Sequence, residues 1–280
     1  MPGASDPRYV LARTVLLDAL EALGEQRAAV IVVGAQAVYL HTGAIDLGVP
    51  EFTIDADITL DPALLREIPE IEAAMLGARF VRGSRVGVWI ASRHVAGVPA
   101  NVEVDLMVPD AVGGPGRRAA RLHGHAKEVA RKTRGLEAAL IDKMEVTIKA
   151  LEPPDPRAFD VAIAGPAALL IAKAHKIAER VGEREQRRLE DKDALDILRL
   201  LQAMQTNALA ATFTDLLQTE VAGDVTREAL AVLNEHFTDA RAAGPQMAVR
   251  AAGALMPAEV VAASCAALAT DLLRALDADK

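Results

Sequence analysis

Two carboxylates stand two residues apart in the strand-like segment Phe52-Thr53-Ile54-Asp55-Ala56-Asp57-Ile58-Thr59-Leu60. Side chains at positions i and i+2 of a strand share one face, so Asp55 and Asp57 are predicted to project together. Two negative charges that close repel each other unless a cation lies between them. Mg²⁺ prefers hard oxygen ligands and typically takes one or two protein carboxylates, while substrate phosphates complete its shell. The segment therefore indicates either a magnesium site or an exposed strand face with alternating polar residues.

An apolar run typical of a buried strand leads through a glycine into a helical pattern in an earlier segment. This segment is Ala29-Val30-Ile31-Val32-Val33-Gly34-Ala35-Gln36-Ala37-Val38-Tyr39-Leu40-His41. A strand, a glycine and a helix N-terminus together form an anion site, because free backbone N–H groups and the helix dipole point at the ligand. A later segment, Asn101-Val102-Glu103-Val104-Asp105-Leu106-Met107-Val108-Pro109, is a further predicted strand with Glu103 and Asp105 on one face.

This order of a glycine turn, a D-x-D strand and a later acidic strand resembles the nucleotidyltransferase superfamily of the DNA polymerase β type, whose pattern is hG[GS], DxD and a further hDh strand. The resemblance implies that Gly34 and Ala35 form the nucleotide-binding turn. It also implies that Asp55 and Asp57 bind Mg²⁺ and that Asp105 is the third metal-binding carboxylate. Ala35 stands where the family usually has Gly or Ser, so one hydroxyl that can contact a phosphate is missing.

The composition predicts a folded, soluble, cytoplasmic protein. The chain has 280 residues, of which 51% are hydrophobic, enough for one large domain or two smaller ones. A formal net charge of -8 and an aromatic content of 3% argue against a protein that coats nucleic acid, so any such contact is expected to be local. The single cysteine, Cys265, excludes an intrachain disulfide. Neither a signal peptide nor an apolar run of membrane-spanning length is present, so no membrane partner is expected.

The remaining patterns predict an α/β (α+β) fold, with a mixed-sheet domain at 1–160 and an α-helical domain at 161–280 that completes the active cleft. We expect helices at 7–23, 35–42 and 63–76, a loop at 43–50, strands at 29–33, 80–81, 86–91 and 101–109, and a hairpin around 94–99. A strand and short helix are expected between 135 and 150, and a last strand at 159–163. From Gly165 onward the pattern is helical, with turns at Gly244-Pro245 and Met256-Pro257.

A basic cluster interrupts this acidic protein. Its members are Arg117, Arg118, Arg121, Lys127, Arg131, Lys132 and Arg134. Such a cluster indicates either a site for a polyanion, such as an RNA backbone or a triphosphate, or a solvated surface that balances acids elsewhere. His123 and His125 lie in the same stretch. Two alternating histidines can ligate a metal, but without a nearby cysteine a strand face is the favoured interpretation.

A second group of charges follows an apolar helical run. Lys173, Lys176 and Arg180 share one helix face, and a lysine at the end of such a run either snorkels to the surface or is held in a cleft. The segments Leu170-Ile171-Ala172-Lys173-Ala174-His175-Lys176-Ile177 and Arg188-Leu189-Glu190-Asp191-Lys192-Asp193-Ala194-Leu195-Asp196-Ile197 resemble the paired motifs of the AbiEii/MenT toxin nucleotidyltransferases. The resemblance covers about residues 30–200. It implies that Lys173 grips the triphosphate, that Asp193 lines the active cleft and that Asp196 supports its helix.

These features together predict a metal-dependent nucleotidyltransferase. The resemblance implies transfer of an NMP from an NTP to RNA, in some members the 3′ end of tRNA, by a bacterial toxin that has an antitoxin protein as its partner. Asp105 would bind a second metal or take the proton of the attacking hydroxyl, and Glu103 is the alternative for either role. Two other readings stay open: an antibiotic-type small molecule or a protein as acceptor, or a non-catalytic module that binds a nucleotide or a partner protein.

Overall fold

The computed structural model describes residues 6–43, 51–95, 98–181 and 191–278. The chain forms two compact units, and each draws on separate stretches of sequence. The first contains Met1–Ala37, Pro50–Leu136 and Lys143–Ala164. The second contains Val38–Val49, Glu137–Asp142 and Gly165–Lys280. Most of the predicted loop at 43–50, and Arg188 with its neighbours, lie outside the described residues.

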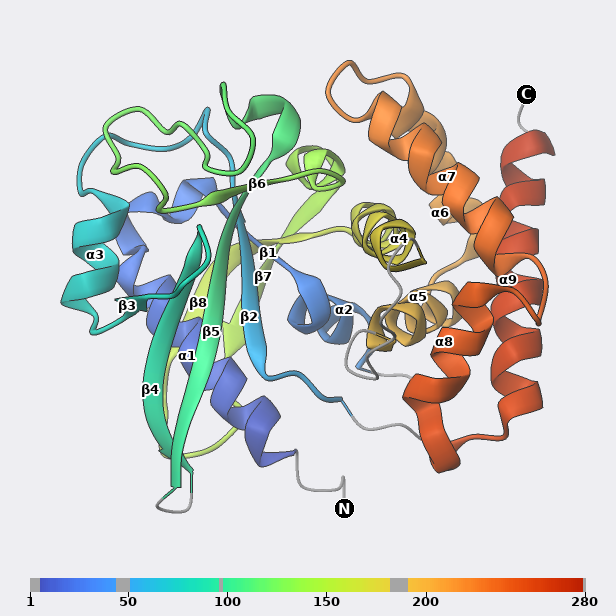
Figure 1. The fold of residues 1–280 in the computed structure, drawn as a ribbon, viewed down its shortest axis with the longest axis horizontal. Helices are drawn as coiled ribbons and strands as arrows, with labels where there is room; N and C mark the ends of the chain where they lie inside the picture. Colours follow the sequence, from blue (N-terminus) through green and yellow to red (C-terminus); the bar gives the residue numbers. More distant parts are fainter. Residues whose placement is uncertain (1–5, 44–50, 96–97, 182–190, 279–280) are drawn as a thin grey trace. The chain divides into compact units, whose positions relative to one another are not determined.

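The described strands of the first unit form one mixed sheet (Figure 1). They are β1 (Val30–Val33), β2 (Asp55–Leu60), β3 (Val81–Arg82), β4 (Val88–Val95), β5 (Val98–Pro109), β6 (Arg131–Thr133), β7 (Lys143–Lys149) and β8 (Ala158–Ala164). Their order is β3-β4-β5-β2-β1-β8-β7, with β6 beside β5. The pairs β1/β8, β2/β5 and β5/β6 are parallel, and the others are antiparallel. The predicted mixed sheet and its last strand are confirmed.

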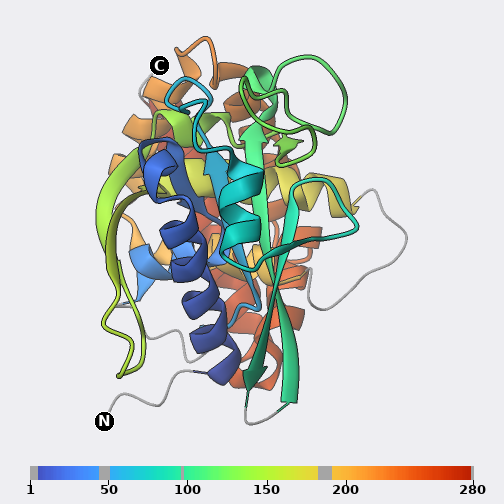
Figure 2. The ribbon, with the colours of Figure 1, turned by 90° about the vertical axis from the view of Figure 1, so that its left-hand side faces the viewer.

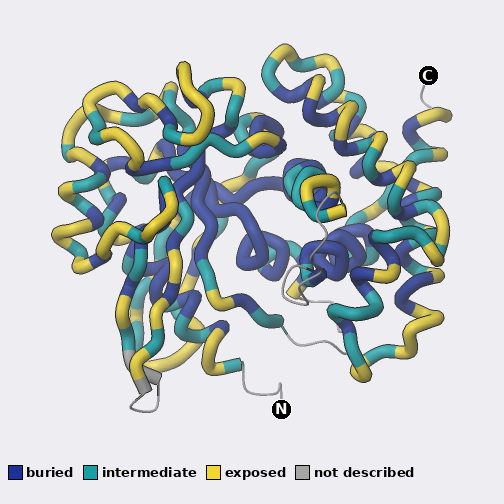
Figure 3. Tube along the Cα trace, viewed as in Figure 1, coloured by how far each residue is buried: buried dark blue, intermediate teal, exposed yellow. Residues whose placement is uncertain are grey.

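Helices of the first unit cover the sheet. They are α1 (Pro7–Ala22), α3 (Ile71–Gly77) and the short 3-10 turns η1 (Gly24–Ala29) and η2 (Asp110–Val112). Figure 2 shows α1 and α3 side by side in front of the strands, and α1 contacts β2, β4, β5 and β8. Pro7 occupies the first turn of α1, where its missing N–H costs nothing, and the Asp6 side chain accepts a hydrogen bond from Arg8 N. The inner strand β1 is buried throughout (Figure 3).

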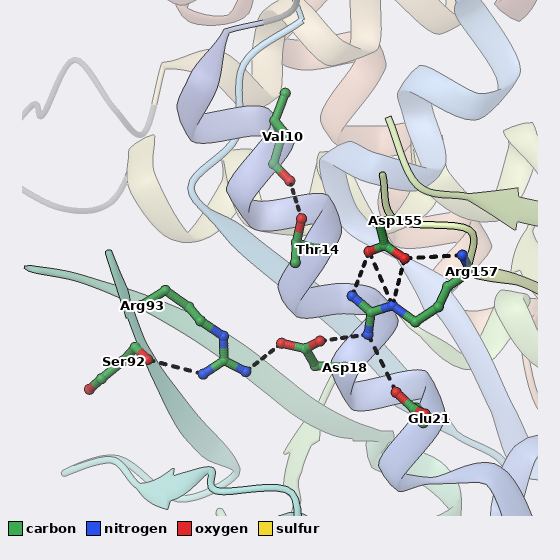
Figure 4. Close-up of polar contacts among 8 residues, drawn as sticks. All are labelled: Val10, Thr14, Asp18, Glu21, Ser92, Arg93, Asp155 and Arg157. Atoms are coloured by element: carbon green, nitrogen blue, oxygen red, sulfur yellow. Dashed lines mark hydrogen bonds and ion pairs between the residues drawn. The ribbon is translucent and has the colours of Figure 1, made fainter. Parts of the chain in front are cut away.

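An ion-pair network fixes α1 to the sheet (Figure 4). The Asp18 carboxylate of α1 accepts hydrogen bonds from Arg93 of β4 and, at 2.6 Å, from Arg157 Nη1. Arg157 precedes β8 and also pairs with Asp155 at 2.7 Å. Asp18 therefore pairs with one guanidinium on β4 and with another just before β8, and these contacts join α1 to two parts of the sheet. Bidentate and shared ion pairs of this kind contribute more to the free energy of unfolding than an isolated surface pair does.

Two predictions for the first unit are wrong. The helix expected at 63–76 is only α3, Ile71–Gly77. Pro69 explains the late start, because it lacks an N–H and excludes helical backbone at the residue before it. His123 and His125 lie in a loop and not on a strand. His125 Nδ1 accepts a hydrogen bond from Ile71 N at 3.2 Å, so this histidine fixes the loop to the start of α3, and burial lowers its pKa.

The second unit is helical over its described residues, as predicted. Its helices are α4 (Pro166–Val181), α5 (Lys192–Ala203), α6 (Thr206–Leu217), α7 (Gly223–Phe237), α8 (Ala243–Ala252) and α9 (Ala258–Ala278), with the 3-10 turns η3 (Glu137–Leu140) and η4 (Gly253–Leu255). Helix α2 (Gly34–Thr42) begins in the first unit and ends in the second. Phe213, Leu233 and Phe237 are fully buried in the core. No helix in the described part of the chain has the length and apolarity needed to cross a membrane.

One predicted turn of this unit is a helix instead. Gly244 and Pro245 lie in the first turn of α8, a position that tolerates proline. Gly244 packs there against the ring of Phe237, where a Cβ atom would lie 2.4 Å from the ring carbon Cζ. Met256-Pro257, by contrast, does separate η4 from α9 as expected.

Asp142 caps helix α4. Its Oδ2 accepts a hydrogen bond from Ala168 N at 2.8 Å, and a Cβ atom at Gly165 would lie 1.9 Å from its Oδ1. Burial raises the pKa of this carboxyl, while the backbone donors of α4 and His41 lower it. This contact explains why the short stretch 137–142 belongs to the helical unit.

Candidate active site

The two predicted metal ligands stand at the start of β2. Asp55 and Asp57 are separated by the buried Ala56, so strand alternation places both carboxylates on the same face. Asp57 is only 9% exposed, and Asp55 is half-buried. Thr53 Oγ1 donates a hydrogen bond to Asp55 Oδ1, and Gln36 Nε2 donates one to the Asp55 carbonyl at 3.2 Å. These contacts fix the backbone and the side chain of Asp55.

The glycine turn lies directly against Asp57. Val33 is the register partner of Asp57 on the antiparallel strands β1 and β2, and Gly34 follows with φ 70°. A Cβ atom at Gly34 would lie 1.9 Å from Asp57 Oδ2. Glycine is therefore required both by the backbone conformation and by the approach of the carboxylate. The predicted phosphate turn, with the buried Ala35 after it, and the D-x-D strand meet at one place in the sheet.

The acids of β5 align with those of β2. Asp105 is the register partner of Asp57, and Glu103 is the partner of Asp55, on parallel strands. Each β5 acid is held by an arginine from another segment. Arg131 Nε and Nη2 donate to Asp105 Oδ1 at 3.0 Å and Oδ2 at 2.7 Å. Arg85 Nη2 donates to Glu103 Oε2 at 2.5 Å.

The donors fit a Mg²⁺ ion held by few protein ligands. Asp55 and Asp57 offer hard carboxylate oxygens on one strand face. Mg²⁺ commonly takes one or two protein carboxylates, and this pair supplies two. Both oxygens of Asp105 already accept hydrogen bonds from Arg131. In the described ranges, no group of three or more His, Cys, Asp or Glu side chains is arranged to hold a metal. The geometry therefore suits a two-carboxylate site better than a three-carboxylate one.

The second predicted group is assembled inside the helical unit. Lys173 Nζ of α4 lies 2.5 Å from Asp193 Oδ1 and 2.6 Å from Asp196 Oδ2, both on α5. Arg180 also pairs with Asp193. Lys173 is 2% exposed, so it does not snorkel to the surface. The structure thus brings together Lys173 and Asp193, and adds Asp196 as an equal partner of the lysine. This group and the acids of β2 and β5 belong to different units.

The pKa values of Asp193 and Lys173 are both shifted toward the charged form. Burial alone would raise the pKa of Asp193, but Lys173, Lys176 and Arg180 outweigh burial and hold it far below its ordinary value. Burial alone would lower the pKa of Lys173, but Asp193 and Asp196 hold it well above its ordinary value. Removing one partner of a buried ion pair strongly destabilises the fold, because the other charge stays buried without compensation.

Six of the seven residues of the basic cluster fall into two kinds. Arg131 is bound to Asp105, and Lys132 Nζ contacts Asp110 at 3.0 Å and the Gly114 carbonyl at 2.9 Å. These two side chains therefore hold the loop together. The side chains that are exposed and have no ion pair within the described ranges are Arg117, Arg118, Arg121 and Lys127. These four side chains present positive charge that pairs with no carboxylate in the described ranges.

Sequence reasoning missed the arginine partners of the β5 acids. Arg85 and Arg131 are 18 and 26 residues from their partners, and no local spacing links them. The sequence signal was weak, because Arg131 begins the polar run Arg131-Lys132-Thr133-Arg134, which lacks the alternation that predicts a strand. No protein-family model matches the chain, and no curated protein is significantly similar to it.

Proposed function

We propose that the chain is a metal-dependent nucleotidyltransferase that moves an NMP from an NTP to an RNA acceptor. One observation carries the proposal: the glycine turn at the start of α2 lies against the buried carboxylate of Asp57, in a position where no side chain fits. A glycine turn at a helix N-terminus beside a carboxylate that binds a metal is what a triphosphate and its Mg²⁺ require in one place.

Each residue of the first unit has a role in this proposal. The backbone N–H groups at Gly34 and Ala35 bind phosphate oxygens, helped by the dipole of α2. Asp55 and Asp57 would hold Mg²⁺, and the bound ion would neutralise phosphate charge. The acceptor hydroxyl needs a proton acceptor, and the β5 acids are the candidates. Asp105 is aligned with Asp57 and Glu103 with Asp55, and each of the two is paired with an arginine, so both stay candidates.

The role of Lys173 as the triphosphate ligand rests on the resemblance to the AbiEii/MenT enzymes alone, because this residue belongs to the second unit. Lys173 is charged and shared between Asp193 and Asp196, so both aspartates orient its ammonium. A phosphate contact at Lys173 would use the third donor of the ammonium group, which has three N–H bonds. Asp193 then acts through Lys173, as a positioning residue.

RNA is the favoured acceptor. Four exposed basic side chains in the loop after η2, Arg117, Arg118, Arg121 and Lys127, provide local positive charge on an acidic protein. The resemblance to the AbiEii/MenT enzymes supports the tRNA 3′ end as the acceptor and supports a toxin role with an antitoxin partner.

The test is transfer of label from each α-³²P-labelled NTP to total RNA in the presence of Mg²⁺. We expect labelled RNA with the wild-type protein and none with Asp57→Asn, which keeps the side-chain shape but removes the charge. Asp160→Asn is the matched control, because Asp160 is an exposed carboxylate of the same sheet on β8. Label on a small molecule or on protein would replace RNA as the acceptor. Absence of transfer to any acceptor with all four NTPs would contradict the proposal.

A further inference from the structure

Arg131 is held in one orientation by contacts from two strands. Besides its two hydrogen bonds to Asp105, Nη1 donates to Thr133 Oγ1 at 3.0 Å and Nη2 lies 3.2 Å from Met107 Sδ. Its side chain is 30% exposed and that of Asp105 is 16% exposed. A planar guanidinium that meets both oxygens of a carboxylate is a geometrically specific pair, which lysine cannot reproduce.

The position of β6 brings this arginine to the level of the metal pair. Strand β4 pairs with β5 only as far as Asp105, and β6 takes over beside β5 from Met107. Arg131 is the partner of Met107 and reaches back along β5 to Asp105. Asp105 is in turn the partner of Asp57 on β2. The order across the sheet at this level is therefore Asp57, Asp105 and the guanidinium of Arg131.

The acids of β5 already have positive partners within the described residues. The charge of Asp105 is matched by Arg131, and that of Glu103 by Arg85. A second divalent ion at Asp105 would have to displace the bidentate guanidinium of Arg131. The positive charge of the ion would then lie beside the positive charge of that guanidinium.

We propose that Arg131 replaces a second metal ion at this site. Asp55 and Asp57 hold a single divalent cation, and Arg131 is a positioning residue that supplies the fixed positive charge at Asp105. This inference rests on the proposed function for the identity of the metal pair. It goes further because it assigns one residue of the basic cluster to the active site and sets the number of metal ions at one.

Binding of Mn²⁺ alone, counted by electron paramagnetic resonance and calorimetry, tests the inference without any transfer reaction. We expect one tightly bound ion per chain in the wild type and none in Asp57→Asn. Asp105→Asn should keep one ion, whereas Arg131→Met, which releases the Asp105 carboxylate, should bind a second ion or bind the first at least tenfold more tightly. Arg131→Lys should stay close to one ion, because it retains the charge.

Two comparisons make the result decisive. Arg85→Gln is the matched control, because it frees the Glu103 carboxylate of the same strand, and it should leave the count at one. Thermal unfolding of each variant shows which of them are folded, and the comparison of the wild type with Asp105→Asn keeps the test where Arg131→Met does not fold. Two ions in the wild type and one in Asp105→Asn would overturn the inference, as would no Mn²⁺ binding by the wild type. One ion in the wild type without nucleotidyl transfer would support the inference while contradicting the proposed function.

Discussion

Gly34 and Asp57 approach each other so closely that a Cβ atom on the glycine would lie 1.9 Å from Asp57 Oδ2. The contact joins the first residue of α2 to the carboxylate of β2. The positive φ of Gly34 adds a second reason for glycine at this position.

Gly34→Ala is therefore expected to destabilise the first unit by about 1–3 kcal/mol, from backbone strain and steric overlap. It should also abolish nucleotide binding, because the displaced carboxylate and turn form one site. Denaturant unfolding and NTP titration measure the two effects. Gly77→Ala is the control, since a Cβ atom at Gly77 meets nothing within 4 Å and its change should be within about 1 kcal/mol. Equal behaviour of the two variants would contradict the contact.

Lys173→Met should destabilise the helical unit by about 3–5 kcal/mol, because it leaves Asp196 buried without its cation. Lys176→Met on the same helix is the control and should cost much less, since Lys176 is half-buried and acts on Asp193 only through its charge. Urea unfolding followed by circular dichroism measures both. A Lys173→Met protein as stable as Lys176→Met would show that the buried cluster does not stabilise the fold.

The pH dependence of stability should reveal Asp142. Its pKa is raised in the folded protein, so the folded state holds the proton more tightly than the unfolded chain. The stability contributed by the protonated form is therefore present below the ordinary aspartate pKa and is lost as the pH rises through the raised value. Asp142→Asn stays neutral and keeps an oxygen that accepts from Ala168 N. Its stability relative to the wild type should increase with pH across this range, and a pH-independent difference would contradict the raised pKa.

RNA binding should depend on the exposed basic side chains and not on the whole cluster. Changing Arg117, Arg118 and Arg121 to Gln should lower the salt dependence of RNA affinity by up to about one unit for each RNA phosphate that these arginines bind. Mn²⁺ binding should stay unchanged, because these side chains do not contact the acids of β2. The control changes three exposed arginines of the second unit, Arg227, Arg241 and Arg274, which alters the net charge equally. Identical salt slopes for the two triple variants would remove this loop from the RNA site.

Much of the local structure follows from the sequence alone. The period of two in Phe52–Leu60 is enough to place Asp55 and Asp57 on one face, and the run from Val30 through Gly34 is enough to predict a strand, a turn and a helix. The helix at Pro166–Val181 and the helical character after it also follow from local periodicity. The helix expected at 63–76 begins late for an equally local reason, because Pro69 keeps the residues before it out of the helix.

The pairing of the charges, by contrast, depends on the tertiary structure. Asp57 faces Asp105 because β2 and β5 are parallel in one particular register, and a shift of one residue would turn either side chain to the other face. Arg131 reaches Asp105 because β6 replaces β4 beside β5, and Lys173 meets two aspartates because α4 packs against α5. The sequence contains these ionisable groups, but the state of each group depends on neighbours that are distant in the chain. Those neighbours come together only when the strands and helices pack. Packing therefore settles that Asp105 and Glu103 pair with arginines and that Lys173 pairs with two aspartates.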